Sequence, residues 1–195
     1  MLSFTAVHAL SRCLFTTCDE ATTVGWGDQP TLLLIHDRRA DRAGATVPVI
    51  RSVEFPVHPD DLPADPSELP ALLHRLALAL HDTDATSVSY RSTLDTIIEL
   101  IRLREPAARL LAWAVLYDDV HTVDGPPRRT RRIDAVDVDG RLYQLTQLPG
   151  EDQPMLVVDD TPEPADTPAT GPGLTALLTA TARFTGGGLV REVTP

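Results

Sequence analysis

An Asp139-Gly140 pair separates two β-rich runs, residues 131–138 and 141–148, and constrains the fold more than any other feature of the sequence. In a two-residue hairpin turn of the commonest type both residues take positive φ, which suits glycine and is tolerated by aspartate. The pair therefore predicts a hairpin in which Val138 lies opposite Arg141. Strands joined by so short a turn pair antiparallel, so the second half of the chain should form a meander.

Four other segments have the side-chain pattern of strands. Residues 32–35 and 155–158 are short apolar runs, and residues 47–57 alternate in polarity except at Arg51, which a bulge or an open sheet edge would explain. Residues 109–120 are apolar at successive positions, so they could form either a central strand or a buried helix. We assign a strand, because the hairpin strands that follow need a partner.

Helical spacing of apolar residues marks the remaining apolar segments. Asp65 can cap a helix that has Pro66 at its first position and a leucine stripe running to Leu80. Proline disfavours helical geometry in the residue before it, so Pro106 should end the next helix near Arg104. We expect helices at residues 3–18, from Pro66 through Leu80, from Ser92 to near Arg104, and from about Leu174 to a point before Gly186.

Strands and helices thus come in separate groups along the chain. This order predicts an α+β fold with a mainly antiparallel sheet, in which two N-terminal strands join a C-terminal meander and helices flank the sheet. A length of 195 residues fits a single domain spanning 1–195. Residues 159–172 are acidic and rich in proline, so they are expected to form a loop or linker before a C-terminal helix.

The composition excludes several classes of protein. All 17 basic residues are arginine, so the P-loop, the pyridoxal-phosphate enzymes and the Schiff-base aldolases, which need a lysine, are ruled out. With a formal net charge of -11, the chain is not expected to bind nucleic acid, which requires a basic face. The sequence has no apolar run of 18 residues, so we expect no membrane-spanning helix. Two cysteines do not make a disulfide framework, and we expect a cytoplasmic protein.

Asp119, His121 and Asp124 form the most metal-like group in the sequence. On a strand, the first two share a face, and Asp124 could join them from the following turn to bind a divalent cation. A metal-assisted hydrolase that uses these three residues is therefore one alternative function. We expect a solvated strand end instead, with no catalytic, cofactor or metal site, because a stable hydrolytic centre usually has three well-supported protein ligands.

Arg128, Arg129, Arg131 and Arg132 form a compact basic cluster in this acidic chain. Guanidinium groups bind carboxylates and phosphates through paired hydrogen bonds, so the cluster is a candidate contact for an anion or an acidic partner. A regulatory module that binds a small anion through this cluster is the second alternative function. A solvated entry to a strand is the simpler explanation of the same residues.

A second charged segment, residues 36–39, follows the predicted strand at 32–35. Loops at strand ends are held by a rigid scaffold and often carry function. Arg38, Arg39 and Arg42 could form an anion site there, although a charged connection between two strands is the simpler explanation.

No nucleophile elbow, zinc-protease helix, paired-cysteine motif or calcium loop occurs in the sequence. An ordinary apolar core combined with this lack of catalytic spacing favours a protein without enzymatic activity. The leading hypothesis is a small cytoplasmic module that binds protein, with a second copy of the chain as a possible partner in a homodimer.

Overall fold

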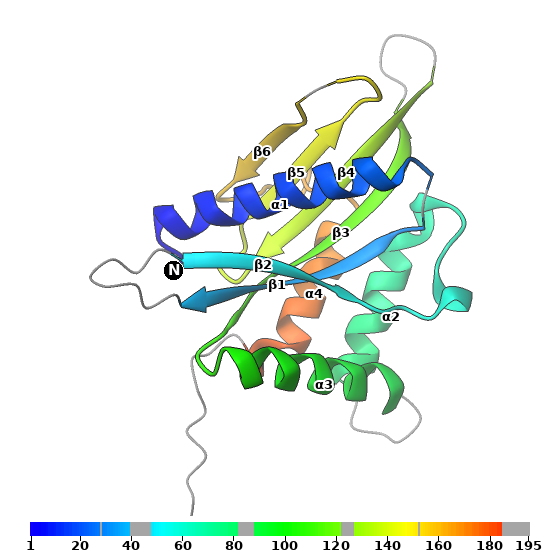
Figure 1. Ribbon diagram of the computed structural model, residues 1–195. Helices are drawn as coiled ribbons and strands as arrows, with labels where there is room; N and C mark the ends of the chain where they lie inside the picture. The colour runs from blue at the N-terminus through cyan, green and yellow to red at the C-terminus, as the bar shows by residue number, and fades with distance from the viewer. Residues whose placement is uncertain (28, 40–47, 82–87, 122–126, 152, 185–195) are drawn as a thin grey trace, which may run out of the picture.

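The computed structural model describes residues 1–27, 29–39, 48–81, 88–121, 127–151 and 153–184 (Figure 1). A six-stranded sheet in the order β2-β1-β3-β4-β5-β6 forms its centre. Every neighbouring pair of strands is antiparallel, which confirms the predicted α+β class. The strands are β1 (Thr31–Arg39), β2 (Pro48–Phe55), β3 (Leu110–His121), β4 (Arg128–Asp137), β5 (Leu142–Gln147) and β6 (Met155–Asp159).

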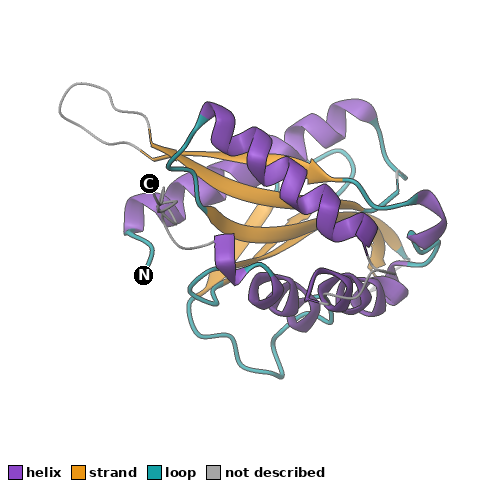
Figure 2. Ribbon diagram, turned by 90° about the horizontal axis from the view of Figure 1, so that it is seen from below, coloured by secondary structure: helices purple, strands orange, loops and turns teal. Residues whose placement is uncertain are grey.

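Helices cover both faces of the sheet (Figures 1 and 2). α1 (Phe4–Val24) lies across one face, where its buried side chains pack on Leu33, Ile35 and the inward residues of β3, β4 and β5. The other face carries α2 (Leu69–His81), α3 (Val88–Arg104) and α4 (Gly171–Ala180). In the described part of the chain, no helix is long and apolar enough to cross a bilayer.

β3 is the central strand that its sequence predicted, and the helical alternative is wrong. Its residues alternate between the two cores, with Trp113 and Val115 on the α2–α4 side and Ala112 and Ala114 beneath α1. Both faces of this strand are covered, so both sets of side chains are apolar. The small alanines lie on the side where α1 packs.

The hairpin between β4 and β5 is present, but its predicted register is wrong by one residue. Val136 pairs with Leu142, and the N–H of Asp137 donates to the main-chain oxygen of Arg141 (3.0 Å), so the loop beyond this pair holds three residues, 138–140, instead of two. The buried Asp137 carboxylate explains the longer loop, because it accepts hydrogen bonds from the main-chain N–H groups of Asp139 (2.8 Å) and Arg141 (3.1 Å). The turn is closed by the N–H of Gly140, which donates to the main-chain oxygen of Asp137 (2.9 Å).

Replacing Gly140 with valine should lower the free energy of unfolding by about 1–2 kcal/mol, because Gly140 has a φ of +83° that a β-branched residue resists. A side chain there meets no atom within 4 Å, so the cost comes from the backbone alone. Gly140→Asn is the matched control and should cost less, since asparagine tolerates this conformation. Equal urea midpoints for wild type and Gly140→Val would contradict the turn.

Three element boundaries differ from prediction by four or more residues. α1 continues to Val24 rather than ending near residue 18, α3 begins at Val88 rather than Ser92, and β1 extends to Arg39. In the added last turn of α1, the Thr22 hydroxyl donates to the main-chain oxygen of Cys18 (2.8 Å). The extra residues of β1 are held by pairing with β2.

Arg51 lies in a regular part of the β1–β2 pairing, directly opposite His36. The bulge that could have explained it is therefore wrong, and the open edge is right, because β2 is the outermost strand of the sheet. The irregularity in this region falls between β1 and β3, at Ile35 and His36.

The two tryptophans should differ in solvent access. Trp113 is fully buried, whereas Trp26, between Gly25 and Gly27, is half-buried beneath the guanidinium of Arg131. Acrylamide should therefore quench a Trp113→Phe variant, which retains only Trp26, more strongly than a Trp26→Phe variant. Equal quenching constants in the two variants would contradict this assignment.

Candidate functional site

The residues of the metal hypothesis lie at the end of β3. Asp119 and His121 occupy alternate positions of that strand, and Asp124 lies outside the described residues. One Asp119 oxygen accepts a hydrogen bond from the N–H of Val120 (2.7 Å), and the other lies 3.9 Å from a guanidinium nitrogen of Arg132. Within the described part of the chain, no group of three His, Cys, Asp or Glu residues could hold a metal ion. The metal-assisted hydrolase stays a prediction from the sequence.

Strand alternation divides the arginine cluster between the two faces of β4. Arg131 points to the α1 face and is 1% exposed, whereas Arg132 points to the opposite face and stacks over the ring of Tyr117. Arg128 and Arg129, at the start of the strand, are exposed. The four guanidinium groups therefore do not form one surface, and a contact with an anion or partner remains a prediction that rests chiefly on the two exposed residues.

Arg131 instead fixes the connection between α1 and β1. Its Nε donates to Asp118 Oδ1 (2.9 Å) on the neighbouring strand, and a second nitrogen donates to the main-chain oxygen of Gly25. The guanidinium carbon lies 4.7 Å from the centre of the Trp26 ring. Asp118 also accepts a hydrogen bond from the N–H of Gly27. This buried ion pair thus anchors three consecutive residues of the loop, which identifies Arg131 as structural.

A buried carboxylate that the sequence analysis missed holds the end of the proline-rich loop. Asp134 has no exposed side-chain surface, and its Oδ2 accepts hydrogen bonds from the hydroxyls of Tyr117 (2.7 Å) and Thr170 (2.7 Å). Burial, followed by the nearby Asp134 charge, raises the pKa of Tyr117, so its hydroxyl remains a donor. The predicted loop at 159–172 is therefore fixed to the sheet just before α4 begins.

The two outer strands of the sheet differ in composition. β2 begins at Pro48 and carries Arg51 and Glu54. Proline and charged residues are common means of preventing an edge strand from pairing with another chain. β2 is therefore a protected edge.

β6 is the opposite edge and lacks this protection. Met155, Val157 and Val158 are 64%, 47% and 39% exposed, respectively, and Leu156 between them is apolar as well. Asp159 is the one charged residue of the strand, and it accepts a hydrogen bond from the N–H of Thr161 (3.0 Å) at the strand's end. An apolar edge strand of this kind is suited to pairing with a strand of another chain, so β6 is the candidate functional site.

Comparison with known proteins gives no match to a family model, to a curated protein or to a solved structure.

Proposed function

We propose that the chain is a non-enzymatic protein-interaction module that pairs through β6 with a second copy of itself. The observation that carries the proposal is the uncharged, exposed edge at residues 155–158, at the opposite side of the sheet from the protected β2 edge. Addition of a strand to an open edge is a common mode of protein recognition, in which main-chain hydrogen bonds supply affinity.

A second copy offers a matching strand. In an antiparallel pair with its twofold axis at Val157, that residue faces its own equivalent, and Leu156 faces Val158 of the partner. Met155 then lies opposite Asp159 of the partner, so no two carboxylates within the paired strands are directly opposed. Such an arrangement is self-complementary, as a closed twofold dimer requires.

The net charge of the chain supports an apolar centre for the contact. Two copies that each carry a formal charge of -11 repel each other at long range. The uncharged residues 155–158 add no like-charge pair at the centre of the contact. Pairing of two five-residue strands buries little area, so we expect a weak dimer whose population depends on concentration.

We also propose that the protein is cytoplasmic, and its cysteines support both this location and the absence of enzymatic activity. Neither Cys13 nor Cys18 forms a disulfide. Burial raises the pKa of Cys18 to about 11 and also raises the pKa of Cys13. Both thiols are therefore protonated at neutral pH, unlike the thiolates that serve as catalytic nucleophiles.

Sedimentation velocity over a range of protein concentrations tests this proposal. Wild-type protein should pass from monomer to dimer as its concentration rises, and Val157→Lys should remain monomeric because it places two like charges opposite each other. Leu78→Lys adds the same charge at an exposed position on α2 and should dimerise like the wild type. A wild-type monomer at all concentrations, or an undiminished Val157→Lys dimer, would contradict self-pairing through β6.

A further inference from the structure

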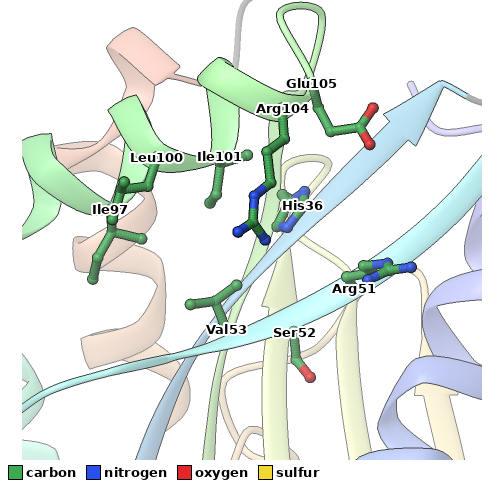
Figure 3. A pocket seen from close by; sticks show the side chains of 9 residues that line it. All are labelled: His36, Arg51, Ser52, Val53, Ile97, Leu100, Ile101, Arg104 and Glu105. Carbon is green, nitrogen blue, oxygen red and sulfur yellow. The ribbon is translucent and has the colours of Figure 1, made fainter.

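A pocket of about 490 Å³ opens at the protected edge of the sheet, far from β6 in the strand order. Its floor comes from β1 and β2, and its wall comes from the second half of α3 (Figure 3). Cavities of this size are typical of sites for small molecules. The pocket brings together three segments that are distant in sequence, so no local sequence motif could have predicted it.

His36 lies at the floor of the pocket. Strand alternation places His36 on the same face of β1 as the core residues Leu32 and Leu34. His36 is only 6% exposed. Its Nδ1 lies 3.2 Å from the main-chain oxygen of Asp37. No hydrogen bond among the described residues involves Nε2, and this atom is not one of the fully buried polar atoms that lack a partner. His36 lines the pocket. The imidazole therefore offers one polar atom to a molecule in the pocket.

Two guanidinium groups border the same space. Arg51 is directly opposite His36 in the sheet, and Arg104 extends from the end of α3 toward the imidazole (Figure 3). Both residues are exposed, and among the described residues neither has a carboxylate within 4 Å, although the chain is acidic. Among the described residues that line the pocket, Glu105 is the one acidic residue, so this part of the lining has an excess of positive charge.

The remaining wall is apolar. Leu94 and Ile98 of α3 are buried against the core, whereas Ile97 and Ile101 are half-buried and line the pocket. Val53 of β2 lies beneath them. The pocket therefore combines an apolar wall with a positively charged rim and a buried imidazole.

We infer that this pocket binds a small organic acid that has one carboxylate and an apolar body. The carboxylate would lie between Arg51 and Arg104, because guanidinium groups bind carboxylates through charge-assisted hydrogen bonds. The apolar body would cover Ile97, Ile101 and Val53. An inorganic anion would leave this wall bare, and a neutral apolar molecule would leave both guanidinium groups without a partner.

Titration of 15N-labelled full-length protein with sodium octanoate and, separately, sodium phenylacetate tests the inference by NMR. We expect saturable one-to-one shifts at β2 and in the second half of α3 with at least one acid. Octanol, which has the same chain without the charge, and inorganic phosphate, which has charge without the chain, should each bind at least about tenfold more weakly than octanoate. Absence of saturable shifts with both acids would overturn the inference.

The Arg51→Gln/Arg104→Gln variant separates a ligand site from an apolar surface. Both side chains are exposed, so the fold should persist, and the affinity for the acid that binds should fall at least about tenfold. Arg75→Gln, an exposed arginine on α2 outside the pocket, should leave the affinity unchanged. If the double variant or octanol binds as well as wild type binds octanoate, the pocket does not recognise a carboxylate and Arg51 serves only to protect the edge.

The pocket and β6 lie at opposite edges of the sheet, so a variant at one should not affect the other. Val157→Lys should bind the acid as the wild type does. A monomeric protein that binds octanoate would contradict the proposed dimer alone, and a dimer that binds neither acid would contradict the pocket alone.

Discussion

Trp113→Ala is expected to lower the free energy of unfolding by about 3–5 kcal/mol, because it opens a large cavity at the centre of the sheet. Trp113 is fully buried, its ring meets Phe55 edge to face at a centroid distance of 5.4 Å, and its Nε1 donates to the Thr181 hydroxyl (3.0 Å). Domains of this size are typically stable by about 5–15 kcal/mol, so the loss is a large fraction of the total. Urea unfolding followed by far-UV circular dichroism measures it.

Trp113→Phe is the matched control for this cavity. It keeps an aromatic ring against Phe55 and removes the hydrogen bond to Thr181, whose hydroxyl still donates to the main-chain oxygen of Leu177 (2.7 Å). The expected cost is on the order of 1–2 kcal/mol. A Trp113→Ala variant as stable as Trp113→Phe would show that the ring does not fill the core as described.

Asp118→Ala is expected to cost about 3–5 kcal/mol, because it leaves the buried Arg131 guanidinium without its carboxylate partner. The side chains of Asp118 and Arg131 are 7% and 1% exposed, so water cannot replace the lost interaction without rearrangement. The α1–β1 loop should loosen at the same time, since Gly25 and Gly27 are held by this pair. Urea unfolding measures the loss, and Trp26 fluorescence reports the loop.

The double variant Asp118→Leu/Arg131→Met distinguishes a lost ion pair from lost packing. Replacing both charges with apolar side chains avoids an uncompensated buried charge, and such replacements are often neutral in other proteins. We therefore expect the double variant to be more stable than Asp118→Ala. A double variant that unfolds more readily than Asp118→Ala would contradict the view that the unpaired guanidinium causes the loss.

The periodicity of apolar residues was sufficient to distinguish helices from strands, whereas the register of the hairpin depended on the chemistry of individual side chains. The doubly apolar run at 109–120 indicated a covered central strand, and the hairpin followed from Asp139-Gly140. The register did not, because it depends on the Asp137 carboxylate and its bonds to the turn. A carboxylate two residues before an Asp-Gly pair is the signal that could have indicated the longer loop.

The arginine cluster shows a different limit of sequence reasoning. Four arginines in five positions suggest one basic surface, but alternation along β4 sends Arg131 and Arg132 to opposite faces. The strand had been predicted to begin at residue 131, so this division could have been deduced. The burial of Arg131 could not, because its partner Asp118 comes from the neighbouring strand.

The pocket beside α3 was only partly visible in the sequence. The charged segment at 36–39 pointed to the end of β1 where the pocket lies. His36 and Arg51 line this pocket, whereas the side chains of Arg38 and Arg39, and the whole of Arg42, lie outside the described residues. Arg51 was the one sequence feature that could have indicated the pocket, because it is a charged residue at a position of the predicted strand where alternation calls for an apolar one. Its meeting with Arg104 depends on tertiary packing, which no single sequence reveals.

Oxidative cross-linking of a Val157→Cys variant tests the central proposal, pairing of β6 with itself, most directly. A twofold axis at this residue places the two introduced thiols opposite each other, where Cα atoms are about 4.5–5.5 Å apart and a disulfide can form. Met155→Cys is the control, because its equivalents would lie about 13 Å apart along the paired strands. We predict a disulfide-linked dimer for Val157→Cys, and none for Met155→Cys or for the wild type with Cys13 and Cys18 alone. No cross-link at Val157→Cys, or equal cross-linking at both positions, would contradict the proposed pairing.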